Sequence, residues 1–492
     1  MYMLRLLFLP SRPLNLKGYP FSFSCKTAEI LRAVAQTVKR VEISVLDGLL
    51  GVKLPNRKFD ERLTKRKTAN IMNDTQRDNI PWQTQAAIYG AGVFSFTMVL
   101  ISTLIIALLA VQLTDSEFLI GLIVGSRYFL TLVLSIHGGA LMDRLGTRRV
   151  MIAFAVVAVI APFLFPLALL LPFAAGISVI ILLQMVAGVS DAMVWVGAQA
   201  LSGQVMQGRR RYVGRMTSIV RLGAFFGPSL FGLLWDNAGI WPTFILMGVW
   251  SALGLLCVLK IPQISEEAEM VSSAPVRVAD LVPRIADYLS AFRLIAIPAV
   301  ALILMVTMVR IGATGIQSSF YVVFLREVEI SAAVIGFLIG FAQLIASGGS
   351  LMAAPIARVL HPHWLTICAV FMAVVTIAIT PVLVFGAPLW VTLLLLAAVI
   401  GLRGLCLGIS QPMEISILGR AISSTEQGKG AGLRTTVNRL ASSIVPPLMG
   451  AIAEVVGIRN SFFVMGAGLL VVLSLAVIFV KCNPSLGDKG DS

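Results

Sequence analysis

The chain has 492 residues, of which 58% are hydrophobic and 13% are charged, and its mean hydropathy is +0.91. Because a soluble domain carries about 25% charged residues, the composition excludes an ordinary soluble protein and indicates a polytopic membrane protein. The net charge of +15 does not indicate nucleic-acid binding, since the basic residues flank apolar runs or lie near the N-terminus, before the first apolar run of bilayer length, as positive-inside topology predicts.

Residues 1–81 differ from the rest of the chain. Met1–Pro10 is apolar but far shorter than the about 20 residues that cross a bilayer, and no small-residue cleavage site follows it, which argues against a signal peptide. Two interpretations stay open, namely an amphipathic or targeting extension and a translation start assigned too far upstream. We favour the second, with Met72 as the alternative start, because residues 72–79 form a short polar lead into the first apolar run. N-terminal mapping of the expressed protein distinguishes the two.

Twelve apolar runs of bilayer length follow from Trp82 onward, each bounded by glycine, proline or charge. We expect each to be a helix, because a backbone in hydrocarbon must satisfy its own hydrogen bonds. The expected spans are 86–112, 118–138, 149–170, 175–201, 216–236, 241–261, 295–324, 332–354, 364–386, 389–418, 433–455 and 461–480.

Charge in the connecting loops predicts the orientation of these spans. Basic residues gather in alternate loops, and the opposite loops carry Asp115, Glu117 and Asp236 or no charge, so both termini are predicted in the cytoplasm. The basic loop residues are Arg144, Arg148, Arg149, Arg209, Arg210, Arg211, Arg358, Arg420 and Lys429.

One long internal loop divides the spans into two halves. Residues 262–292 form an expected cytoplasmic connector, rich in glutamate at its start. It separates a first six-helix half, 82–261, from a second, 293–481, and a short cytoplasmic tail, 482–492, follows.

Internal repetition supports these halves. The segment Gly214–Gly248 aligns without a gap on Gly432–Gly466, with 12 identities in 35 positions. Shared apolar composition would not pair Arg221 with Arg439 or Pro228 with Pro446. The fifth and sixth spans are therefore repeated as the eleventh and twelfth.

A charged turn between the second and third spans carries the strongest motif. The sequence from Gly139 to Arg149 has the pattern Gly-x-x-x-Asp-Arg-x-Gly-x-Arg-Arg, which resembles the signature loop of the major facilitator superfamily, with Thr147 where a basic residue is usual. An ordinary positive-inside loop would supply the arginines without the aspartate and both glycines. The motif residues are Gly139, Asp143, Arg144, Gly146, Arg148 and Arg149.

The resemblance implies a mechanical role for this loop. In the family, the loop aspartate bridges to nearby basic residues and to a helix N-terminus of the other half, which closes the cytoplasmic side. A carboxylate suits that place because a helix N-terminus carries partial positive charge. The expected partners of Asp143 are Arg144 or Arg148 and the start of the eleventh span near 431–434. The equivalent loop of the second half, 354–363, has no acid, so one latch is expected.

The fifth span carries a second motif. Its glycines and proline are similar to the antiporter signature of the same superfamily, with Phe231 in place of the first glycine of the final pair. The alternative is a stripe of small residues for helix packing, which is common in membrane helices. The motif residues are Gly214, Gly223, Gly227, Pro228 and Gly232.

Ionisable residues inside spans are costly and indicate functional sites or structural ion pairs. In the fourth span Gln184, Gly188, Asp191 and Trp195 share one helix face, as do Arg403 and Glu414 with Ser410 in the tenth. If the deep arginines line a cavity, the positive charge of its wall favours an anionic or zwitterionic substrate. The alternative is structural pairing, for instance of Asp191 with Arg127. The cavity and coupling candidates are Arg127, Gln184, Asp191, Trp195, Arg310, Arg403 and Glu414.

Proton coupling is assigned to Asp191. Related families often carry a coupling arginine in the fourth span followed by glutamine and glycine, but here Gln184 and Ala187 replace the first two and only Gly188 is kept. A carboxylate in a low-dielectric cavity can instead load and release a proton in step with substrate. Asp191 is therefore the expected coupling residue.

Other chemistry is not indicated. The sequence has no His-Glu-x-x-His, phosphate-binding Gly-x-x-x-x-Gly-Lys or Gly-x-Ser-x-Gly pattern, so hydrolytic and ATP-driven mechanisms are disfavoured and no enzyme is expected. The five cysteines show no metal or disulfide spacing. His361 and His363 are interpreted as a loop at the membrane face rather than a metal site. No cofactor or metal is expected, and a proton gradient is the expected energy source.

These patterns together predict an all-α membrane protein with twelve transmembrane helices in two pseudo-symmetric six-helix halves. The expected function is secondary transport of a small organic molecule by alternating access, as a proton-linked exporter. Two alternatives stay open: proton-coupled uptake of an organic anion, and a non-transporting receptor or scaffold with the same fold, which a cross-link between the halves would leave functional. We expect a monomer in the plasma membrane, or the inner membrane of a bacterium, with no nucleic-acid partner.

Overall fold

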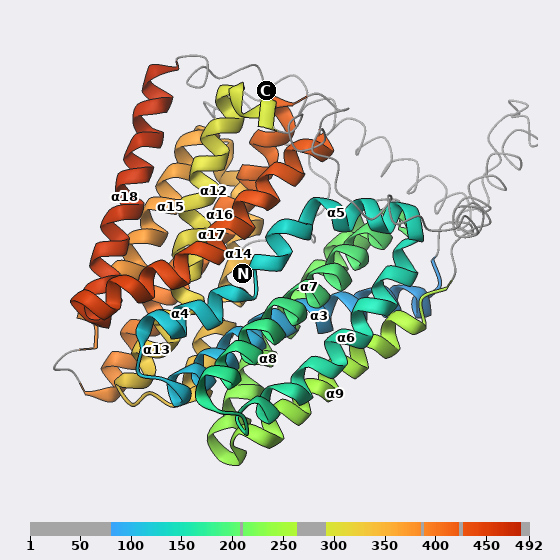
Figure 1. Cartoon of the computed structure of the whole chain (residues 1–492). Helices are drawn as coiled ribbons and strands as arrows, with labels where there is room; N and C mark the ends of the chain where they lie inside the picture. Colours follow the sequence, from blue (N-terminus) through green and yellow to red (C-terminus); the bar gives the residue numbers. More distant parts are fainter. Residues whose placement is uncertain (1–79, 207–209, 263–291, 385–387, 423–426, 484–492) are drawn as a thin grey trace, which may run out of the picture. The chain divides into compact units, whose positions relative to one another are not determined.

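The computed structural model describes residues 80–206, 210–262, 292–384, 388–422 and 427–483. The expected N-terminal extension, the connector and the tail therefore lie outside the described residues except at their edges. Within the described parts, twelve helical spans are long and apolar enough to cross a membrane, and Figure 1 shows them as bundled helices. The prediction of an all-helical membrane protein with twelve spans is confirmed.

The first half contains six spans, and the second of them is built from two helices. The bounds are α3 (Trp82–Leu113), α4 (Glu117–Ser126) with α5 (Phe129–Leu145), α6 (Thr147–Ala168), α7 (Phe173–Val205), α8 (Arg210–Ala238) and α9 (Ile240–Leu259).

The second half repeats this arrangement, with its first span built from two helices. The bounds are α12 (Pro298–Ser318) with α13 (Phe320–Glu327), α14 (Ala332–Ala357), α15 (Pro362–Ala378), α16 (Leu389–Ala421), α17 (Gln427–Val456) and α18 (Ile458–Cys482). Short 3-10 turns at Arg293–Ala296 and Thr380–Val382 precede α12 and follow α15.

Local sequence explains where several helices begin. Ser116 and Ser331 are N-caps whose side chains accept hydrogen bonds from the backbone N–H groups of Leu119 and Val334. Pro298 and Pro362 occupy first-turn positions, where no backbone donor is needed.

The signature turn is shorter than the sequence pattern predicted. Residues 139–145 continue α5, because nothing in Gly-Ala-Leu-Met-Asp-Arg-Leu interrupts a helix, and α6 begins at Thr147. The reversal falls on Gly146 alone, whose φ of +85° is accessible to glycine at little cost. The motif's second glycine is therefore the residue that makes the turn.

The sequence repeat is visible in the backbone. Gly239 joins α8 to α9 and Gly457 joins α17 to α18, with φ values of +79° and +82°. The gapless alignment of the two halves pairs these same two glycines. The halves therefore turn at equivalent positions for the same stereochemical reason.

Two ends of the bundle are distinguished by their turns. The arginine-rich end holds the C-terminal ends of α5, α7, α14 and α16, and the arginine-poor end holds the turns at 113–117, 168–173, 238–240, 327–332 and 456–458.

The halves meet along two equivalent seams (Figure 1), α8 against α14 and α17 against α4. In the first, side chains added at Gly336 and Gly340 would meet the carbonyl oxygens of Pro228 and Phe225. In the second, side chains at Gly121 and Gly125 would meet those of Pro446 and Ser443. Glycine permits this backbone approach, as in other membrane helix pairs.

A third contact completes each seam at the arginine-poor end. Gly232 lies against the carbonyl oxygen of Ala332, and Gly450 lies against that of Glu117. Beside the first contact, Asp236 accepts hydrogen bonds from the backbone N–H groups of Ala332 and Ala333, at 3.1 and 2.8 Å. A carboxylate at this helix N-terminus holds the start of α14 to the end of α8.

The seam predicts a stability difference between two glycines of the same helix. Gly232→Ala should lower the Tm of the purified full-length protein, because its methyl group would meet the Ala332 carbonyl and overpacking costs about 1–3 kcal/mol. Gly214→Ala is the matched control, since a side chain there meets open space and alanine favours a helix by about 1 kcal/mol. Equal Tm values for the two variants would contradict the close seam.

Candidate functional site

The first half contains a buried polar cluster at the break in its second span. Arg127 lies between α4 and α5, and its Nη2 donates to the Asp191 carboxylate of α7 at 2.5 Å. Its Nη1 donates to Ser102 of α3 at 2.8 Å and to Gln184 of α7 at 3.3 Å. The two charged side chains are only 3% and 7% exposed. Three of the predicted candidates are therefore brought together, with Ser102 added.

Glycine on α7 permits this cluster. A side chain at Gly188 would collide with the backbone of Arg127, so the one residue of the family's coupling pattern that this chain keeps serves close packing of α7 on the break. Trp195, one turn beyond Asp191, packs its ring against Phe96 of α3, with ring centroids 5.0 Å apart. It extends the same helix face.

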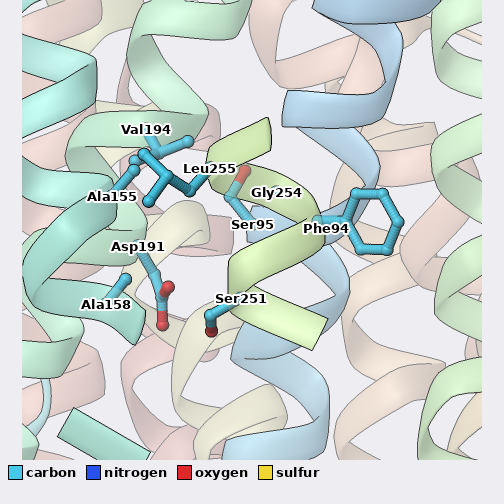
Figure 2. A pocket seen from close by; sticks show the side chains of 9 residues that line it. All are labelled: Phe94, Ser95, Ala155, Ala158, Asp191, Val194, Ser251, Gly254 and Leu255. Atoms are coloured by element: carbon cyan, nitrogen blue, oxygen red, sulfur yellow. The ribbon is translucent and has the colours of Figure 1, made fainter. Parts of the chain in front are cut away.

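Asp191 also lines a small pocket inside the first half (Figure 2). The pocket lies among α3, α6, α7 and α9, and Figure 2 shows the Asp191 carboxylate and the Ser251 hydroxyl beside it. The Ser251 Oγ is buried and has no hydrogen-bond partner among the described residues. One side of Asp191 thus meets Arg127, and the other meets a pocket with a free hydroxyl. The pocket lining is Phe94, Ser95, Ala155, Ala158, Asp191, Val194, Ser251, Gly254 and Leu255.

The second half contains its own buried ion pair. Arg310 of α12 donates from Nε to the Glu414 carboxylate of α16 at 2.7 Å, and the Thr307 hydroxyl donates to the other oxygen at 2.9 Å. Glu414 is 0% exposed. Arg434, at the start of α17, interacts electrostatically with both members of the pair. Sequence reasoning selected Arg310 and Glu414 separately, and the structure pairs them.

Arg403 differs from the other predicted arginines. It is 1% exposed, and its Nε and Nη2 have no hydrogen-bond partner among the described residues. Its guanidinium lies over the ring of Tyr321, 5.5 Å from the centroid, and the buried Tyr321 hydroxyl likewise has no partner there. Glu414 and Ser410, on the same helix face, do not bond to it.

The repeated arginines of the fifth and eleventh spans lie at the seams. Arg221 donates to Gln343 of α14 at 2.6 Å, and Arg439 lies over the ring of Tyr128, 5.8 Å from its centroid. Each arginine therefore contacts the opposite half.

The helix-five motif faces two neighbours. Gly223 and Gly227 lie against Thr97 of α3, whereas Pro228 and Gly232 belong to the seam with α14. Gly214 lies in open space. The motif therefore packs α8 on both halves, and its proposed link to antiport stays a prediction.

The signature residues are placed only in part. The surroundings of Gly139 and the side chains of Asp143 and Arg144 lie outside the described residues. Arg148 donates from Nη2 to the carbonyl of Leu259 at 3.0 Å, which ties α6 to the end of α9, and Arg149 is exposed. The latch between Asp143 and α17 stays a prediction.

Metal ligands are not clustered in the described part of the chain: no group of three or more histidine, cysteine or acidic side chains there could hold a metal ion. His361 and His363 have ring centroids 5.2 Å apart at the turn into α15.

Sequence reasoning missed Ser102, Thr307, Tyr128, Tyr321 and Gln343. The last three lie at helix breaks or seams, and hydropathy does not predict where an apolar run breaks or which residues contact the other half. The signal that could have found the seams is a second gapless repeat, in which Ser116, Ile120, Gly121 and Gly125 recur as Ser331, Ile335, Gly336 and Gly340.

No curated protein sequence matches the chain. Among solved structures, the nucleoside transporter NupG has a TM-score of 0.64 at 13% identity, covering 82% of this chain and 100% of that chain. A POT family transporter in complex with a thioalcohol-conjugated peptide has a TM-score of 0.60 at 14% identity, covering 82% and 96%. The inward-open xylose transporter XylE from E. coli has a TM-score of 0.59 at 15% identity, covering 81% and 95%.

These structural similarities show a shared fold, and the family follows from the sequence. The sequence model of the Major Facilitator Superfamily matches residues 87–402 and 303–490, which together span nearly all of the twelve helices. With two repeated six-helix halves and a multi-pass membrane architecture, the chain belongs to the major facilitator superfamily.

Proposed function

We propose that the chain is a proton-linked secondary transporter that exports a small organic molecule by alternating access, with its arginine-rich end in the cytoplasm. The observation that carries this proposal is the buried Arg127–Asp191 pair at the break between α4 and α5. In-membrane charges of this kind commonly mark proton relays and substrate pathways.

The two seams support alternating access. The glycine contacts between the halves lie toward the arginine-poor end, beside the turns at 113–117, 238–240 and 327–332. Halves joined at one end can part at the other, and the Asp143 latch would close the arginine-rich end in the alternate state. Export then requires substrate to enter from the arginine-rich end and leave after the seams open.

The position of Arg127 supports the proposal of proton coupling. Its span is divided, so that α4 packs on α17 of the opposite half while α5 carries the signature turn. Protonation of Asp191 would remove the negative partner and leave Arg127 with the neutral groups of Ser102 and Gln184. A change at Arg127 is therefore transmitted to a helix of the seam and to the latch.

Asp191→Asn should abolish coupling while preserving the fold. Asparagine keeps the shape of the side chain but cannot exchange a proton, so pH-gradient-driven transport should fall to the level measured without a gradient. The measurement is a screen of labelled small organic solutes in inverted vesicles with an imposed pH gradient, followed by assay of the variant on the solute found. Asp115→Asn, at an exposed carboxylate, is the control. Undiminished coupling in Asp191→Asn refutes the assignment.

Asp143→Asn should slow the conformational cycle. A carboxylate at a helix N-terminus contributes about 0.3–1 kcal/mol, so its loss should reduce the transport rate about two- to fivefold. The amount of protein inserted in the membrane should be unchanged, as measured by fluorescence of a C-terminal fusion. Full transport activity in this variant would overturn the latch.

Proton-coupled uptake of an organic anion is the second candidate. It is favoured by the excess of buried arginines, because Asp191 and Glu414 neutralise Arg127 and Arg310 but leave Arg403 without a described carboxylate partner. Cells that express the protein and accumulate a labelled carboxylate would select uptake over export.

A further inference from the structure

The buried guanidinium of Arg403 is an unusual feature for a membrane interior. An arginine keeps its positive charge in proteins, and burying a charge without a partner costs several kcal/mol. Arg403 is 1% exposed, and its Nε and Nη2 are buried with no hydrogen-bond partner among the described residues. A group from outside the described chain is needed to satisfy it.

The nearest candidates within the described chain are already occupied. Glu414 lies three helical turns further along α16, about 16 Å at the helical rise per residue, and it is bonded to Arg310 and Thr307. Among the described residues, the buried ion pairs are Arg127 with Asp191 and Arg310 with Glu414. No described carboxylate therefore neutralises Arg403.

The unpartnered atoms indicate which kind of group fits. The N–H bonds of Nε and Nη2 point in parallel from one edge of the guanidinium, and that edge binds a carboxylate through two parallel hydrogen bonds. The guanidinium carbon of the same side chain lies over the ring of Tyr321, 5.5 Å from its centroid. A cation–π contact uses the charge and not a hydrogen bond, so it positions the arginine while Nε and Nη2 stay without a partner among the described residues.

The backbone beside Tyr321 is also specialised. The seventh span breaks at Ser319, between α12 and α13, where φ is −119° and ψ is −86°. Tyr321 follows in the first turn of α13 and is 0% exposed. Discontinuous helices near the membrane midplane are where transporters of several folds bind their cargo.

We propose that Arg403 is the docking site for the carboxylate of a monoanionic substrate, with Tyr321 orienting the guanidinium. A monoanion fits because one fixed positive charge faces it, whereas a phosphate dianion would need a second. This inference rests on the proposed function in taking the bound anion to be the transported molecule. The existence of the carboxylate site can be tested by binding alone, without transport.

Binding of simple carboxylates tests the site without transport. Purified full-length protein in lipid nanodiscs is titrated at neutral pH with acetate and benzoate, and with acetamide and benzamide as neutral counterparts of the same shape. At least one carboxylate should raise the Tm in a concentration-dependent way, and neither amide should. A Tm rise from inorganic phosphate alone would overturn the carboxylate assignment, and no rise from any anion would overturn the site.

Arg403→Met separates a ligand-binding arginine from a structural one. Methionine fills similar volume without charge, so in the absence of anions the Tm should rise by about 2 °C, and the carboxylate effect should vanish. An arginine with a structural partner would give a lower Tm instead, and that result would contradict the proposal. Arg293→Gln, at an exposed arginine, is the control and should keep the carboxylate effect.

If Arg403→Met does not fold, a conservative variant at the same position tests whether Arg403 binds the carboxylate. Arg403→Lys keeps the charge but loses the two-donor edge, so binding of radiolabelled benzoate or acetate should weaken about tenfold or more. Unchanged affinity would overturn the role of the edge. If carboxylates bind but no solute is transported in vesicles, the binding site is supported and the proposed transport function is refuted. If neutral solutes are transported but no carboxylate binds, only the binding site is refuted.

Discussion

Backbone contact between the halves is the constraint on which the rest of the structure depends. Within a membrane no hydrophobic force drives helices together, so close packing at small residues, where backbones can touch, is a main source of attraction between the two halves. Here each seam makes the same set of contacts, with Gly336 on Pro228 matched by Gly121 on Pro446. The contacts repeat, so the halves share two similar seams. On the proposal of alternating access, the halves would rock about these seams.

The seams also explain the repeated arginines. Arg221 meets Gln343 and Arg439 meets Tyr128, and these partners occupy equivalent positions of α14 and of the second span in the repeat that pairs Gly125 with Gly340. The sequence repeat paired the two arginines but could not reveal the partners, because glutamine and tyrosine share no chemical pattern. The two arginines are therefore elements of the seams.

Sequence reasoning predicted the parts of the fold that hydropathy controls and missed those set by contacts between spans. The twelve spans follow from bilayer length, and the turn at Gly239 and Gly457 follows from glycine stereochemistry. No proline lies near the breaks at Arg127 and Ser319, so no local signal marks them. The pairing of Arg127 with Asp191 was foreseen as one of two alternatives, but that of Arg310 with Glu414 depends on how α12 faces α16.

The three deep arginines differ in whether they have a carboxylate partner, and this difference suggests that the two halves bind different species. Arg127 and Arg310 have carboxylate partners, so their surroundings can respond to a proton taken up by the acid. Arg403 has none among the described residues and keeps its own charge, so it can respond only to an anion brought from outside. On the proposals made for Asp191 and Arg403, α7 holds the proton and α16 holds the cargo. These are equivalent helices of the two halves, with Gly188 and Gly404 at matching close contacts. Proton and substrate would then bind in different halves. Their coupling would pass across the two seams, because α4 and α14, which form the seams with α17 and α8, also pack on α7 and α16.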